Sequence, residues 1–334
     1  MYKKKSLVFL LLLLLVVITV TCKKNIPVTA VTLNLIFLPL TVGETEILTP
    51  TVLPVDATNK EILWTSDNPI VATVVNGLVI PHVEGTATIT ATTLDGNKTA
   101  GCNVKVYKYV EGEPEMVIVE GGTFTMGCTK EQGNNCFKWE YPIHKVTVDG
   151  FKIGKYPITQ KQWETFMGNN PSHFKGGNLP VERVSWEDAQ EFIAKLNAAT
   201  GKNYRLATEA EWEFAARGGN LSKGYRYSGS DNPDEIAWYN INSGNTTLSV
   251  GTKAPNELGI YDMSGNIWEW CNDWYGSYSA KTQTNPLGPV EGSYRVGRGG
   301  SWSYSVDYCR VSYRYYADPK RRDNRLGLRI AYSL

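Results

Sequence analysis

Short hydrophobic runs alternate with polar residues throughout positions 28–107, and turn residues such as Asn76-Gly77 and Asp95-Gly96 separate the runs. At positions 86–91, alanine and isoleucine fall on one face and threonine on the other, which is the period of a half-buried strand. Trp64 lies within one run, where a single aromatic ring can fill a small core. Because no helical spacing interrupts this stretch, the pattern predicts an all-β sandwich.

From residue 115 onward, helical spacing appears in a few short segments. Apolar residues recur at helical spacing over 186–196, directly after Ser185 as a candidate N-cap. Thr159 with Gln162, and Thr208 with Glu211, have the spacing of capping boxes. The remainder is glycine-broken loop and short strand. The pattern predicts an α+β domain with little regular secondary structure over 115–334, joined to the sandwich by a polar linker at 108–114.

The N-terminal residues have the pattern of a targeting segment. Lysines at 3–5 precede an apolar run over 7–20, which is shorter than the roughly 20 residues of a membrane-spanning helix. A short membrane anchor would have the same pattern. Cys22 follows where lipoprotein signals are cleaved and acylated, although Thr21 replaces the more usual small residue. We predict a lipoprotein signal peptide at 1–22, lipidation of Cys22, a tether at 23–27, and a lipid-anchored protein of the bacterial envelope, exposed on the outer membrane.

Composition argues against two classes of function. The chain has 34 lysines and arginines against 33 acidic residues, whereas nucleic-acid binders carry a basic excess. The three histidines, His82, His144 and His173, are scattered along the chain, which argues against a histidine-rich metal site.

Export would permit disulfides among the remaining cysteines. Cys128 and Cys136 flank a short polar loop and could close it, although two unpaired thiols are an equally simple reading. Cys271 and Cys309 could form a second bridge. With Cys22 lipidated, five cysteines including Cys102 remain, so at least one is unpaired or bonds to another chain.

Residues 28–107 resemble the group 2 bacterial immunoglobulin-like domain. The resemblance rests on positions 40–43, 55–58, 64–68 and 85–91. It implies a stalk or adhesion module of a surface protein.

Residues 115–334 resemble the formylglycine-generating enzyme (sulfatase-modifying factor) family, which has a C-type-lectin-like fold. The matching blocks are 121–127, 157–160, 180–186, 205–213, 256–270, 298–302 and 326–330. The family's oxidases bind copper(I) between two cysteines five positions apart. The second matches Cys309, but the first falls on Tyr304, and one thiolate cannot complete the pair. Related iron-dependent sulfoxide synthases need three histidines, and this domain has two. We therefore expect no copper, no catalytic residues and no enzymatic activity.

The resemblance also implies a structural calcium site. Its ligands match the side chains of Asp262 and Glu269 and the backbone carbonyls of Gly265 and Ile267. A plain turn with a glutamate ion pair is the alternative.

The C-terminal segment has the composition of a binding surface, because tyrosines stand among serine, aspartate and arginine. It resembles the variable segment of diversity-generating retroelement proteins, which mutate adenines in codons such as AAC. Lys320 and Trp302 lie outside the residue types that such mutation can produce, and all the candidate ligand-binding positions lie within them. Ordinary relatives of this fold can have similar loops. The candidates are Ser303, Tyr304, Ser305, Asp307, Tyr308, Tyr315, Tyr316, Ala317, Asp318, Arg321, Asp323, Asn324 and Arg325.

Together these features predict a surface lipoprotein with a sandwich stalk and a lectin-like head that binds a protein or glycan ligand, and no nucleic acid. Two alternatives remain, a copper-dependent oxidase and a non-catalytic scaffold lipoprotein of the envelope.

Overall fold

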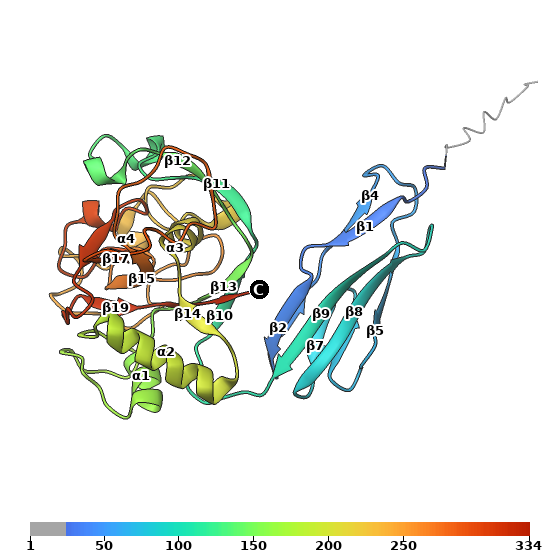
Figure 1. The fold of residues 1–334 in the computed structure, drawn as a ribbon, viewed down its shortest axis with the longest axis horizontal. Coiled ribbons are helices and arrows are strands. Elements are labelled where there is room, and N and C mark those ends of the chain that lie inside the picture. Colours follow the sequence, from blue (N-terminus) through green and yellow to red (C-terminus); the bar gives the residue numbers. More distant parts are fainter. Residues whose placement is uncertain (1–24) are drawn as a thin grey trace, which may run out of the picture.

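The computed structural model describes residues 25–334, in which the chain forms a β-sandwich followed by a larger head (Figure 1). The predicted signal peptide and Cys22 lie outside the described residues. No helix in the described part of the chain is long and apolar enough to cross a membrane.

The sandwich contains strands and no helix within residues 25–107, which confirms the all-β prediction. Its main sheet has the order β2-β9-β8-β5, a second sheet the order β3-β7-β6, and β1 pairs with β4. Leu38, Ile89 and Val104 are buried between the sheets, and Trp64 packs against this core. The strands are β1 (Ala30–Leu33), β2 (Phe37–Thr41), β3 (Glu46–Ile47), β4 (Pro50–Leu53), β5 (Ile62–Ser66), β6 (Ala72–Val75), β7 (Leu78–Pro81), β8 (Gly85–Thr93) and β9 (Thr99–Tyr107).

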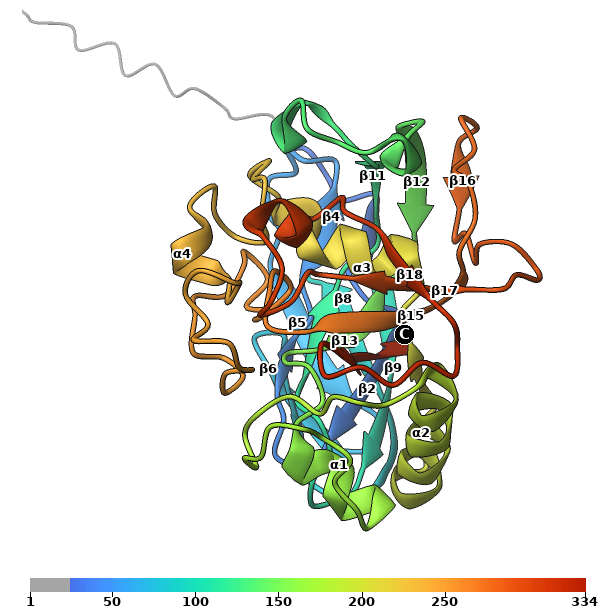
Figure 2. The ribbon, with the colours of Figure 1, turned by 90° about the vertical axis from the view of Figure 1, so that its left-hand side faces the viewer.

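The head is built on small sheets with short helices around them (Figure 2). One sheet has the order β10-β13-β20-β14, another β11-β12-β16, and a third β18-β17-β15-β19. The strands are β10 (Met116–Val119), β11 (Gly122–Met126), β12 (His144–Val148), β13 (Phe151–Gly154), β14 (Tyr204–Leu206), β15 (Trp268–Trp274), β16 (Gln283–Thr284), β17 (Arg295–Arg298), β18 (Tyr315–Ala317), β19 (Leu326–Leu328) and β20 (Ile330–Ser333).

The helices begin where their caps predict. Thr159 caps α1 (Gln160–Met167), Ser185 caps α2 (Trp186–Thr200), and Thr208 caps α3 (Glu209–Ala216), each within a complete capping box. Within residues 25–334, the short helix α4 (Pro233–Ile236) and four 3-10 turns complete the set, namely Lys130–Gln132, Lys138–Glu140, Gly219–Leu221 and Val306–Cys309. The local sequence signals therefore identified the longer helices correctly.

The predicted polar linker is docked between the two domains. Glu113 accepts hydrogen bonds from the buried Lys202 ammonium and from the Tyr204 hydroxyl. Lys202 Nζ also lies 2.6 Å from the Thr41 hydroxyl of the sandwich. The side chains of Ile118 and Leu334 from the head pack against the sandwich core. A buried ion pair and shared apolar contacts therefore hold the sandwich against the head.

Candidate functional site

A cluster of aromatic rings surrounds Trp268, the first residue of β15. The Tyr315 ring stacks on the indole with centroids 4.9 Å apart, and the Tyr304 ring meets it edge-on at 5.6 Å. Tyr308 packs between Tyr304 at 5.0 Å and Tyr313 at 4.8 Å. Tyr313 and Trp268 are buried, whereas the other three are half-buried. The structure thus brings three predicted ligand-binding tyrosines together over a buried base.

Charged groups border this aromatic cluster. Arg321 and Arg325 each hydrogen-bond Asp323 at 2.6 Å, and Arg325 Nη1 donates to the Tyr304 hydroxyl at 3.3 Å. Burial disfavours the Asp323 carboxylate, but the hydrogen bonds from Arg325 and Arg321 outweigh it and lower the pKa of Asp323 to about 2. The two guanidiniums and the Asp323 carboxylate together carry one net positive charge, which lies beside the aromatic rings.

The thirteen predicted positions do not all reach the same surface. Eleven are exposed or half-buried, but Ala317 and Asp323 are buried, so these two are corrected from ligand contacts to packing and positioning residues. Tyr316 is exposed, yet it contacts Tyr275 and Tyr294 instead of the Trp268 cluster. Successive residues of a strand point to opposite faces, and this separates Tyr316 from Tyr315.

Two aromatic residues that the sequence analysis missed extend the cluster. Phe137 and Trp139 are stacked with centroids 4.7 Å apart, and Phe137 meets the Tyr313 ring edge-on at 5.5 Å. They follow the loop closed by Cys128 and Cys136, which are disulfide-bonded, so of the two readings the bridge is confirmed. The signal available in the sequence was the presence of two aromatic residues within three positions after Cys136.

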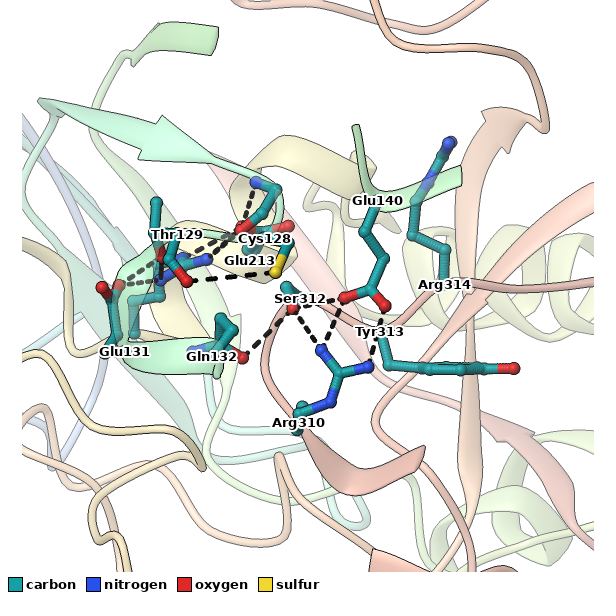
Figure 3. A network of polar contacts seen from close by, with 12 residues as sticks. Cys128, Thr129, Glu131, Gln132, Glu140, Glu213, Arg310, Ser312, Tyr313 and Arg314 are labelled. Atoms are coloured by element: carbon teal, nitrogen blue, oxygen red, sulfur yellow. Dashed lines mark hydrogen bonds and ion pairs between the residues drawn. The ribbon is translucent and has the colours of Figure 1, made fainter. Parts of the chain in front are cut away.

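A buried polar network joins this loop to residues 310–312 (Figure 3). Arg310 donates two hydrogen bonds to Glu140, of 2.7 and 2.8 Å, and both side chains are fully buried. The Ser312 hydroxyl donates to Glu140 at 2.5 Å, and Arg310 Nη1 lies 3.3 Å from Cys136 Sγ. Burial opposes ionisation of Glu140, but the hydrogen bonds from Arg310 and Ser312 lower its pKa.

Removing the disulfide is expected to loosen this loop. The double change Cys128→Ser and Cys136→Ser should lower the free energy of unfolding by about 2–3 kcal/mol, because the unfolded chain regains the freedom that the bridge removes. Urea denaturation followed by tryptophan fluorescence measures the loss. A reductant should destabilise the native protein to the same extent and leave the double variant unchanged. Equal stability of the variant and the oxidised protein would contradict this prediction.

The two positions that match the paired cysteines of the oxidases that this sequence resembles are Cys309 and Tyr304. Cys309 is fully buried, and burial raises the pKa of its thiol to about 12, so it stays protonated at neutral pH. The position of the other cysteine is taken by the Tyr304 phenol. Cys271 and Cys309 are both unpaired in separate buried clusters, so the bridge predicted between them is wrong.

The two side chains among the predicted calcium ligands, Glu269 and Asp262, both have protein partners. Arg329 donates to both carboxylate oxygens of Glu269, at 2.9 and 2.7 Å, and the Trp212 indole donates to Glu269 at 2.7 Å. Asp262 accepts the Gly251 N–H at 2.7 Å, and burial raises the pKa of Asp262 to about 6. Glu269 therefore has the ion pair that the alternative, a plain turn, predicts. Calcium binding by Asp262, Gly265, Ile267 and Glu269 stays a prediction.

Comparisons with known proteins agree with both resemblances. The family model of the sulfatase-modifying factor enzyme 1-like domain matches residues 105–334, and that of the group 2 bacterial Ig-like domain matches residues 27–104. The chain is 37% identical over 269 residues to the chaperone protein LppX of Paenibacillus barcinonensis, covering 66% of this chain and 89% of that protein. It is 29% identical over 285 residues to the formylglycine-generating enzyme of Mus musculus, covering 65% of this chain and 74% of that enzyme.

A solved structure is similar as well. Treponema denticola variable protein 1 matches with a TM-score of 0.61 and 32% identity, over 68% of this chain and 98% of that one.

Proposed function

Because this chain belongs to the sulfatase-modifying factor enzyme 1-like family but has Tyr304 in place of a paired cysteine, we propose that its lectin-like head binds a ligand through residues 303–325. The ligand is a surface protein or glycan. The single observation that carries this proposal is the half-buried group of Tyr304, Tyr308 and Tyr315 around Trp268. Tyrosines held in place by a packed base give a large contact area at a small entropic cost.

Residues 303–325 fall into two groups, buried residues that anchor the segment in the head and exposed residues that are accessible to a ligand. Arg310, Ser312 and Arg314 are buried and hydrogen-bonded to other parts of the head. Ser305, Asp318 and Arg321 are exposed. Exposed positions can change without loss of the fold, because the buried contacts carry its stability. This division supports diversification of the segment by a retroelement, as does the similarity to the Treponema variable protein.

The proposal includes the place of the protein in the cell. A chain anchored through Cys22 would present the head beyond a stalk that is fixed against it by the Glu113–Lys202 pair. A fixed stalk would hold the binding segment in one orientation relative to the membrane.

One ligand-binding variant has a matched control. Tyr308→Ala should weaken binding about 10- to 100-fold, since a central aromatic contact is worth roughly 2 kcal/mol. Tyr109→Ala should leave binding unchanged, because Tyr109 is 66% exposed and lies in the linker, outside residues 303–325. The full chain is first screened on a glycan array and on a display library of surface proteins, and affinities are then measured for the ligand found. Equal losses for the two variants would contradict this assignment.

Comparison of isolates tests the diversification and separates the binder from the envelope scaffold. We expect variation at the exposed and half-buried positions and constancy at Arg310, Ser312 and Arg314. A near-copy of the coding segment beside a reverse transcriptase gene would accompany it. Constant sequence throughout 303–325 would instead favour the scaffold.

A further inference from the structure

One arginine in residues 303–325 has a positive charge that the protein does not neutralise. Arg325 binds both carboxylate oxygens of Asp323, through Nε–Oδ1 and Nη2–Oδ2 distances of 2.6 Å. Arg321 makes a single hydrogen bond to the same carboxylate, from Nη2 to Oδ2 at 2.6 Å. Because one carboxylate balances only one guanidinium, Asp323 neutralises its bidentate partner Arg325, and the charge of Arg321 remains.

The other charges of this segment balance one another. Asp318 and Lys320 have opposite signs, and both are exposed. The remaining charged side chains each form an ion pair of 2.6 to 2.9 Å with a partner of opposite sign, and these are Asp307, Arg310, Arg314 and Arg322. Residues 303–325 and their partners therefore carry one net positive charge, which belongs to Arg321.

This guanidinium is accessible, and its position is fixed by the protein. The Arg321 side chain is 49% exposed, and its Nε and Nη1 have no hydrogen-bond partner among residues 25–334. A turn holds the backbone, since the Arg321 N–H donates to the Asp318 carbonyl at 2.9 Å and the Lys320 N–H donates to the Asp318 carboxylate at 2.8 Å. The hydrogen bond to Asp323 restrains the side chain itself. A ligand would therefore lose little entropy in ordering this group.

Arg321 also adjoins the aromatic cluster. Asp323 joins it to Arg325, whose Nη1 donates to the Tyr304 hydroxyl at 3.3 Å and whose guanidinium carbon lies 5.3 Å from the centre of that ring. Burial raises the pKa of Tyr315, and the charge of Arg321 is the largest influence that opposes it. The hydroxyls of Tyr308 and Tyr315 have no hydrogen-bond partner among the described residues, and both residues are half-buried. A ligand at this cluster therefore meets phenol donors and a free guanidinium together.

The arrangement of the rings favours a protein ligand over a glycan. Tyr304 is tilted by 49° from Tyr308 and by 74° from Trp268, so the rings form no single flat platform against which a sugar ring could pack. Tyrosine, tryptophan and arginine gathered at one place are typical of the residues that dominate binding energy in protein–protein interfaces. The planar guanidinium matches a carboxylate, which it can bind through two parallel hydrogen bonds.

We propose that residues 303–325 bind an acidic segment of a partner protein, in which an aspartate or glutamate carboxylate pairs with Arg321 while neighbouring atoms contact Tyr308 and Tyr315. This inference rests on the proposed function, because it names the chemistry of the ligand for the same surface. Arg321 is itself one of the candidate positions for diversification. The acidic preference therefore belongs to the form of the segment that this chain carries.

Selection from a library of displayed random peptides, with the full chain as the target, tests the ligand class. We expect the selected peptides to be enriched in aspartate and glutamate. Replacing the acidic residues of a selected peptide with their amides should weaken binding at least about tenfold. Affinity for the acidic peptide should fall as salt rises from about 0.05 to 0.5 M, because salt screens exposed charges. A selection that yields no binder, or only binders without acidic enrichment, would overturn the proposal, and binding of oligogalacturonate in its place would indicate an acidic glycan.

Variants of the chain localise the interaction. Arg321→Ala should weaken binding of the acidic peptide about tenfold and leave the affinity for its amide counterpart nearly unchanged. Arg321→Lys keeps the charge but not the planar fork, so it should recover part of the affinity. Lys60→Ala removes one positive charge from an exposed position in the sandwich and should leave the affinity unchanged. Urea denaturation should show that Arg321→Ala remains folded, because Arg325 still neutralises Asp323.

The outcomes separate the acidic partner from the proposed function. A loss of peptide binding in Tyr308→Ala with full affinity in Arg321→Ala would refute the acidic partner and leave the proposed surface in place. Equal losses for Arg321→Ala and Lys60→Ala would show an effect of net charge alone and would also refute it. Full affinity of both Tyr308→Ala and Arg321→Ala would refute the proposed function itself.

Discussion

Replacing Arg310 with methionine is expected to lower the free energy of unfolding of the head by about 3–5 kcal/mol. The side chains of Arg310 and Glu140 are both fully buried, and the guanidinium supplies two of the hydrogen bonds to the carboxylate. Methionine fills the same space but leaves Glu140 as a buried carboxylate without its cation. Urea denaturation followed by tryptophan fluorescence measures the loss.

An exposed ion pair of similar geometry provides the control. Arg322 also binds a carboxylate through two hydrogen bonds, both 2.7 Å long to Asp188, but its side chain is 57% exposed. Arg322→Met should therefore cost no more than about 1 kcal/mol. Adding Glu140→Leu to Arg310→Met should restore much of the stability, because no unpaired charge then remains. Similar losses for Arg310→Met and Arg322→Met would show that burial does not govern this pair.

The network around Arg310 also shows where inference from the sequence ends. The caps at Thr159, Ser185 and Thr208 act within one turn of their own helix, so local spacing was enough to predict them. The contact of Phe137 with Tyr313 joins residues far apart in the chain, and no local pattern encodes it.

The same limit explains the corrected positions. Composition marked Ala317 and Asp323 as ligand contacts, because both residue types fit a diversified surface. Their burial is set by the path of β18 and by Arg321 and Arg325, which enclose the Asp323 carboxylate. Composition indicates which residue types suit a binding surface, but the fold determines which of these residues are exposed.

Motif matching has a comparable limit at the predicted calcium ligands. The blocks containing Glu269 and Arg329 were each recognised, but the pairing of Glu269 in β15 with Arg329, which follows β19, became visible only in three dimensions. The linker is a further case, since Glu113 was assigned to a polar connection and is instead paired with Lys202. In both places the carboxylate has a partner that is distant in the sequence.

A second large effect is expected on the pH dependence of the free energy of unfolding, through the buried carboxyl group of Asp273. Burial, followed by the charge of Glu209, raises the pKa of Asp273 to about 8, compared with about 4 in the unfolded chain. The native state therefore holds this proton more tightly than the unfolded state does. The stabilisation is complete below pH 4 and is lost as the pH rises to about 8. Across this window the wild-type protein should lose about 5 kcal/mol relative to Asp273→Asn, which has no proton to release.

The comparison with Asp273→Asn isolates this group, because all other titrating side chains are the same in both proteins. Urea denaturation of each at pH 4, 5, 6, 7 and 8 gives the difference in free energy of unfolding at each pH. From pH 4 to pH 8, the free energy of unfolding of the wild-type protein should fall steadily relative to that of Asp273→Asn. A difference between the two proteins that stays constant with pH would contradict the prediction.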